Sequence, residues 1–199
     1  ENGVAILYRQ RNNNGKWTRA LGSFFAELTP IKGLVIKSLM GYNYGQWNYR
    51  GFTIPNFEHS EPNKVNGHNV STNNSLQWNF TNTAIYNFSV ADDHKFNVLV
   101  GTEAIDNKYE EANASRSQYF SEDPDYMWLN SGEINKDNNG YGSEWALFSI
   151  FGRLNYDYMG KYLAEATFRR DGSSRFSKAN RYGNFPAFSL GWGVSEENF

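Results

Sequence analysis

The sequence predicts an all-β protein made of long, antiparallel, up-and-down strands. Apolar and polar residues alternate over many stretches, which is typical of strands with one apolar face, whereas helical spacing of apolar residues is rare. Aromatic residues make up 17% of the 199 residues and asparagine occurs 26 times, yet the mean hydropathy is −0.70. No run approaches the roughly 18 apolar residues of a membrane-spanning helix. This aromatic content also excludes a disordered chain.

We expect eight strands, at about residues 3–9, 18–29, 33–46, 74–90, 94–109, 143–158, 161–172 and 184–195. The first is a short apolar segment, and the next two flank turn residues at 29–32. The fourth and fifth flank Asp92 and Asp93, with most aromatic and aliphatic residues at even positions. In the sixth, even positions from 148 to 158 hold Phe, Ile, Gly, Leu and Tyr, and odd positions hold Ser, Phe, Arg, Asn and Asp. The last two strands alternate in the same way.

Strand and loop lengths favour a membrane barrel over an ordinary soluble sheet. Several expected strands exceed 12 residues, whereas strands of soluble proteins average about 5–6. Short turns near 29–32, 92–93 and 159–160 alternate with long polar loops at 47–73, 110–142 and 173–183. Another polar loop, 10–17, precedes the first pair of long strands. Outer-membrane barrels combine short periplasmic turns with long extracellular loops in this way.

One strand face is expected to be aromatic and aliphatic, and the other to carry charged side chains. The charged positions are Glu27, Lys37, Lys95, Glu103, Arg153, Asp157, Glu165 and Arg169. A soluble sandwich shows a similar alternation, so a soluble all-β glycan-binding module is the alternative reading. A pI near 6.0 argues against a nucleic-acid partner.

No motif indicates catalysis, a cofactor or a metal. The sequence lacks HExxH, GxSxG and Walker motifs, and without cysteine it has no disulfide or Cys-ligated zinc site. His59, His68 and His94 are expected in loops or turns. A calcium-loop template starting at Asn135 fails, because it needs an acid there and a glutamate at Ala146. We therefore expect no enzyme.

Aromatic residues set among Asn, Ser and Gly in the long loops are the candidate substrate contacts. Aromatic rings stack on the apolar faces of sugars, and such loops also suit peptides. The candidates are Trp47, Tyr49, Tyr119, Tyr126, Trp128 and Tyr141. The alternative for each of them is packing within the loop itself.

The last 57 residues carry ordered motifs that resemble a known family. These motifs are SEWAL at 143–147, GRLNY at 152–156, KYL at 161–163, RRDGSSRF at 169–176, NRYG at 180–183 and FPA at 185–187. This segment is similar to the barrel of the SusC/RagA family of TonB-linked outer-membrane transporters of Bacteroidetes. The upstream resemblance is looser but collinear. Gly193 departs from the family pattern, which often has a basic residue there.

The resemblance implies a barrel of about 22 strands, of which this chain would supply about eight. It also implies import of oligosaccharides, or less often peptides, across the outer membrane of a Gram-negative bacterium. The partners implied are a SusD-like surface lipoprotein, TonB and outer-membrane lipid. No plug domain or TonB box is recognisable in 1–199, so we expect an internal, incomplete part of the barrel.

The RRDGSSRF motif is expected to be structural, with its arginines pairing with Asp171 or neighbouring acids at the base of a loop. Asp-Gly followed by two serines supplies turn chemistry. Direct contact with substrate is the alternative. The motif comprises Arg169, Arg170, Asp171, Gly172, Ser173, Ser174, Arg175 and Phe176.

Overall fold

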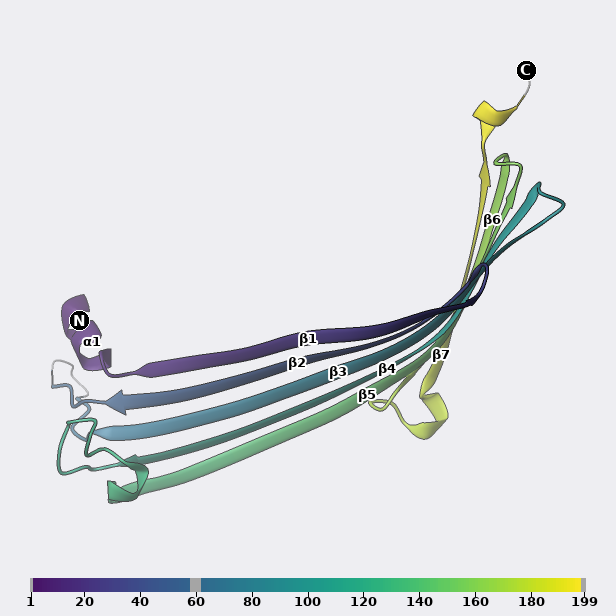
Figure 1. Cartoon of the computed structure of the whole chain (residues 1–199). Helices are drawn as coiled ribbons and strands as arrows, with labels where there is room; N and C mark the ends of the chain where they lie inside the picture. Colours follow the sequence, from purple (N-terminus) through teal and green to yellow (C-terminus); the bar gives the residue numbers. More distant parts are fainter. Residues whose placement is uncertain (1, 58–61, 198–199) are drawn as a thin grey trace. The chain divides into compact units, whose positions relative to one another are not determined.

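The computed structural model describes residues 2–57 and 62–197, and seven strands form one sheet in chain order from β1 to β7 (Figure 1). The strands are β1 (Asn14–Ile31), β2 (Leu34–Thr53), β3 (Gly67–Val90), β4 (His94–Ser117), β5 (Ile134–Tyr158), β6 (Tyr162–Ser173) and β7 (Tyr182–Trp192). Three short 3-10 helices lie at Leu129–Ser131, Lys178–Asn180 and Val194–Glu196. The all-β, antiparallel, up-and-down prediction is confirmed.

The segment predicted as the first strand is instead a helix, α1 (Gly3–Gln10). The Asn2 side chain accepts a hydrogen bond from the Val4 backbone N–H at 3.0 Å, which caps the helix N-terminus. Val4, Leu7 and Tyr8 follow helical rather than strand spacing, so the segment prefers a helix. Among the described residues, no helix has both the length and the apolar character needed to cross a membrane.

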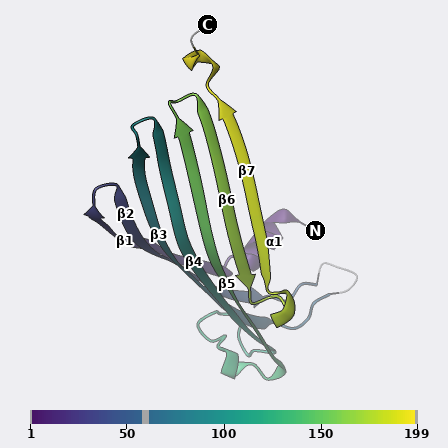
Figure 2. The same cartoon turned by 90° about the vertical axis from the view of Figure 1, so that its right-hand side faces the viewer.

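The predicted turns at 92–93 and 159–160 are present, whereas the turn expected at 29–32 lies at 32–33 because β1 runs to Ile31. Ala91 and Asp92 both have positive φ, as do Met159 and Gly160, and two consecutive positive φ values are typical of the hairpin turns that suit strand twist. Gly33 also has positive φ between β1 and β2. Figure 2 shows the β3–β4 and β5–β6 turns at the same end of their strands.

The strands extend beyond the predicted boundaries, which shortens the loops. Residues 47–53, 67–73, 110–117 and 134–142 were expected in loops but belong to β2, β3, β4 and β5. Polar side chains bridge neighbouring strands there: the Thr72 hydroxyl donates to the Asn48 side chain at 2.9 Å. Cross-strand polar pairs stabilise a sheet as apolar pairs do, so the sheet continues where apolar alternation ends.

The described chain divides into two compact units. The first comprises Glu1–Ala20, Tyr44–Leu76 and Lys108–Ser143, and the second comprises Leu21–Asn43, Gln77–Asn107 and Glu144–Phe199. Each unit therefore holds segments of several strands.

In the second unit, the strand register separates two faces of the sheet. Ser149 pairs with Asp171 and Phe151 with Arg169 on one face, which we call the polar face. The adjacent positions, such as Leu154 opposite Ala166, form the apolar face. Although neighbouring strands flank both, Ile150 of β5 and Phe168 of β6 on this face are 52% and 48% exposed. Large apolar groups left uncovered in a row indicate a surface that meets apolar surroundings.

Candidate functional site

The six candidate aromatic residues fall into two groups, both in the first unit. Trp47 and Tyr49 lie in β2 and Tyr141 lies in β5, so these three are strand residues and not loop residues as expected. Tyr119, Tyr126 and Trp128 lie in the β4–β5 loop, residues 118–133, as expected.

Trp47 and Tyr49 lie on the same face of β2, because side chains alternate along a strand. Gly51 lies two residues further on, and any side chain there would collide with Asn69 of β3 and Tyr49. Trp47 packs against Trp17 of β1, with ring centroids 6.0 Å apart. This face therefore carries indole and phenol rings beside an asparagine.

The same face continues onto β4 and β5. Asn73, four residues after Asn69, donates from Nδ2 to the Tyr109 hydroxyl at 3.2 Å. The Tyr109 and Tyr141 ring centroids are 6.4 Å apart. Tyr141 is mostly exposed, so its ring is available to a ligand.

The β4–β5 loop shares a small core with the end of β2. Met127 is fully buried and packs with Phe52 and Tyr119, the other buried apolar residues among those described. Burial raises the pKa of the Tyr119 phenol above its ordinary value. The ring of Tyr119 is thus used inside the loop and is not exposed for a ligand.

The Asn66 side chain fixes this loop to the start of β3. Its Oδ1 accepts from the Tyr119 backbone N–H at 2.7 Å, and its Nδ2 donates to the Tyr119 carbonyl at 2.9 Å. A weaker bond joins Nδ2 to the Ser121 carbonyl at 3.4 Å. One buried amide thereby satisfies both backbone groups of Tyr119, as a neighbouring strand would.

Exposed aromatic rings lie on the outside of the same loop. Trp128 is 57% exposed and lies under the Arg50 guanidinium, 4.9 Å from its ring centroid. Phe120 and Tyr126, also exposed, form an edge-to-face pair with centroids 5.5 Å apart. These rings offer stacking surface, and Arg50 also covers the Phe52 ring.

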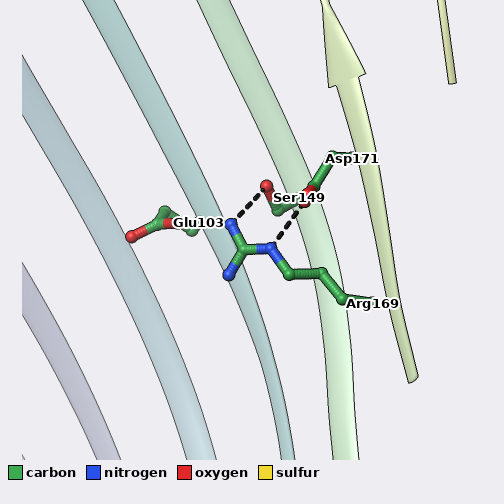
Figure 3. Close-up of polar contacts among 4 residues, drawn as sticks. All are labelled: Glu103, Ser149, Arg169 and Asp171. Atoms are coloured by element: carbon green, nitrogen blue, oxygen red, sulfur yellow. Dashed lines mark hydrogen bonds and ion pairs between the residues drawn. The ribbon is translucent and has the colours of Figure 1, made fainter. Parts of the chain in front are cut away.

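Arg169 of the RRDGSSRF motif joins three strands in the second unit (Figure 3). Its Nε donates to Asp171 at 2.6 Å, and its Nη2 donates to Glu103 at 2.7 Å and to the Ser149 hydroxyl at 2.9 Å. Ser149 is only 3% exposed. The guanidinium also lies over the Phe151 ring. Charge-assisted hydrogen bonds of this kind fix β4, β5 and β6 together on the polar face.

The rest of the motif forms the base of the β6–β7 loop. The Ser174 hydroxyl accepts from the Ala146 N–H at 2.8 Å, and the Ser174 N–H donates to the Ala146 carbonyl at 2.9 Å. Any side chain at Gly172 would collide with the Tyr182 ring, over which Arg170 lies. Arg175 similarly covers Trp145.

The histidines occupy three different settings. His68 was expected in a loop but is buried in β3, where it stacks on Phe52 and its Nδ1 bonds to the Gly51 carbonyl at 2.9 Å. His94 begins β4 and bonds to the Tyr156 hydroxyl at 2.7 Å. His59 lies outside the described residues. Within 2–57 and 62–197, no three His, Asp or Glu side chains gather as a metal site.

Sequence comparisons relate the chain to TonB-dependent receptors. It is 34% identical over 202 residues to TonB-dependent receptor P39 of Formosa agariphila, which covers all of this chain and 19% of that receptor. It is 52% identical over 64 residues to TonB-dependent receptor SusC of Bacteroides thetaiotaomicron, which covers 32% of this chain and 6% of SusC. No family model matches the chain.

Structural comparison gives the same relationship. The RagAB peptide transporter aligns with a TM-score of 0.84 and 26% identity, over 94% of this chain and 20% of that chain. The RagAB peptide importer in its open-open state aligns with a TM-score of 0.85. This chain spans about a fifth or less of the length of these relatives.

Proposed function

Because this chain belongs to the SusC/RagA family of TonB-dependent receptors and corresponds to part of their barrel, we propose that it forms barrel wall and outer loops of an outer-membrane transporter that imports oligosaccharides. The seven strands supply the wall. The β4–β5 loop and the aromatic face of the first unit supply substrate contacts. The relatives are receptors and transporters, and we assign this chain no catalytic step.

The apolar face of the second unit supports the membrane location. Ile150 of β5 and Phe168 of β6 lie on this face and are about half exposed although strands flank both, and Phe188 and Leu190 lie on the same face of β7. A soluble sandwich would cover such a face with a second sheet, but the strands of the described residues form a single sheet. This argues against the soluble glycan-binding module. Lipid satisfies an outward apolar band of this kind.

The aromatic and amide groups of the first unit carry the choice of oligosaccharide as substrate. Trp47, Tyr49 and Tyr141 share their face with Asn69 and Asn73, so flat rings alternate with amides. Rings pack on the apolar faces of sugars, and an amide both donates and accepts hydrogen bonds, as hydroxyl groups require. Trp128 and Tyr126 add exposed rings on the loop.

Peptide import is the second candidate, because the structural relatives are a peptide transporter and importer. Extended peptides need unpaired backbone groups or pockets for alternate side chains. The described face offers rings and amides in strands that are already paired, which favours sugars.

We further propose that a SusD-like surface lipoprotein and TonB act with the complete receptor, as in the family. An uptake assay tests the function. Cells that carry the receptor and its adjacent lipoprotein gene are supplied with fluorescently labelled oligosaccharides and peptides, and a receptor deletion is the control. We expect receptor-dependent uptake of an oligosaccharide. Uptake of peptides alone, or no dependence on the receptor, contradicts the proposal.

A further inference from the structure

A carboxylate lies beside the Tyr109 ring of the first unit. Glu111 of β4 accepts a hydrogen bond from the Tyr109 hydroxyl on Oε2 at 2.6 Å, and Asn113 approaches its Oε1 at 3.5 Å. Asn73 donates to the same hydroxyl, so the phenol proton is directed at Glu111. The Tyr141 ring flanks Tyr109. None of the sequence motifs indicated Glu111 or Tyr109.

A small hollow lies beside this cluster. It has a volume of about 170 Å³ and shares Asn113 with the cluster. Six of its eight lining residues carry an amide, hydroxyl or carboxylate group: Asn69, Asn113, Ser115, Asp137, Asn138 and Asn139. We call the hollow and the cluster together the Glu111 subsite.

The chemistry of the Glu111 subsite selects for hydroxyl groups. Two carboxylates, Glu111 and Asp137, only accept hydrogen bonds when ionised, and the amides of Asn69 and Asn113 both donate and accept. A sugar hydroxyl can donate to a carboxylate and accept from an amide. The exposed Tyr141 ring provides a flat apolar surface beside them.

The same two carboxylates repel anions. At the half-buried position of Glu111, a ligand carboxylate or sulfate in contact with it would be repelled by a like charge that water screens only in part. Unfavourable charge against the wrong ligand is a common source of specificity.

We propose that the Glu111 subsite binds a neutral sugar residue of the transported oligosaccharide and discriminates against uronate and sulfated sugars. This inference rests on the proposed function and names its substrate class. Glu111 acts as the hydrogen-bond acceptor for sugar hydroxyls. Tyr109 positions Glu111, and Tyr141 stacks on the ring.

Binding to the complete receptor in detergent tests the proposal. The probes are neutral gluco-, manno-, xylo- and galacto-oligosaccharides, an oligogalacturonate measured with EDTA, and a lysine-containing peptide, each titrated by calorimetry. We expect at least one neutral oligosaccharide to bind at least tenfold more tightly than the oligogalacturonate. Glu111→Gln should reduce this preference at least tenfold.

Glu110→Gln is the matched control, because Glu110 is the next residue, faces the opposite side of β4 and pairs with Lys108 at 2.8 Å. It should leave the preference unchanged. Equal or tighter uronate binding, no neutral binder, tighter binding of the peptide, or an unchanged preference in Glu111→Gln overturns the subsite. The uptake assay separates the two claims: if neutral oligosaccharides are imported but Glu111→Gln has no effect, only the subsite fails.

Discussion

At the scale of single residues, Arg169 does most to hold the polar face of the second unit. It joins Glu103 of β4, Ser149 of β5 and Asp171 of β6 through one guanidinium. The ammonium group of lysine is a compact point charge, whereas the planar guanidinium of arginine donates to several acceptors at once. We therefore assign Arg169 a structural role.

Arg169→Gln should destabilise the folded receptor by about 1–3 kcal/mol, because Glu103, Asp171 and the buried Ser149 lose their shared donor. Thermal unfolding in detergent measures the effect. Arg170→Gln is the matched control, since Arg170 covers the Tyr182 ring on the opposite face. Equal losses in the two variants would contradict the assigned role of Arg169.

Glu197 links the segment after β7 to the β5–β6 turn. Its carboxylate accepts from Lys161 at 3.1 Å, from the Tyr162 hydroxyl at 3.0 Å and from Trp192 at 3.3 Å. The Lys161 hydrogen bond, followed by those of Tyr162 and Trp192, holds the pKa of Glu197 below its ordinary value. The carboxylate is thus stabilised in its ionised form.

The pKa of Glu197 is lower in the folded than in the unfolded protein. Its hydrogen bonds therefore stabilise the fold fully above the unfolded pKa of about 4.3, and this stabilisation is lost as the pH falls through the folded pKa. We expect protection of the Gly193 amide, bonded to the Lys161 carbonyl at 2.7 Å, to fall in that acidic range. Hydrogen exchange, corrected for intrinsic rates, measures it. Glu197→Gln should be insensitive to pH there. An identical pH profile in both proteins would refute the link.

At the scale of elements, the β4–β5 loop is held by a few buried groups. Met127 fills its core, and Asn66 satisfies both backbone groups of Tyr119. The exposed rings of Trp128 and Tyr126 depend on this support for their positions. The loop is therefore ordered and holds its exposed aromatic side chains in fixed positions.

Asn66→Ala should lower the local opening free energy of this loop by about 2 kcal/mol, because it leaves buried backbone groups of Tyr119 unpaired. Faster hydrogen exchange and proteolysis within residues 118–133 report the change. Asn63→Ala is the control, since the Asn63 side chain bonds only the exposed Val65 N–H among the contacts seen. Unaltered exchange in Asn66→Ala would show that the Asn66 hydrogen bonds do not hold the loop.

Sequence alternation predicted the strands well wherever one face is apolar, as in β5 and β6. It failed at residues 3–9, where the cap at Asn2 selects a helix. It also ended strands too early at 46 and 109 and began them too late at 74 and 143, because asparagine and threonine pairs extend the sheet without an apolar period. Glu111 and Tyr109 were not predicted as site residues, because their contact with Asn73 depends on strand register, which alternation alone does not give.

At the scale of the whole molecule, a barrel wall has one face toward lipid and the other away from it. Adjacent positions on β7 test this directly. Leu190→Arg should cost about 2–4 kcal/mol of folding free energy in vesicles if residue 190 faces the bilayer interior. Ser189→Arg, one residue away on the polar face, should cost much less. Equal costs would contradict the assignment of faces.

A spin-label scan of β5 in the complete receptor, reconstituted in lipid, tests the barrel-wall role directly. This segment contains no cysteine. With any cysteine elsewhere in the receptor replaced, single cysteines from 148 to 157 can be labelled and their collisions with oxygen and with a water-soluble relaxation agent compared. We predict period-two alternation, with positions 148, 150 and 154 accessible to oxygen in lipid and 149, 151 and 153 shielded from it. A scan without alternation, or with the opposite phase, would contradict the barrel-wall account.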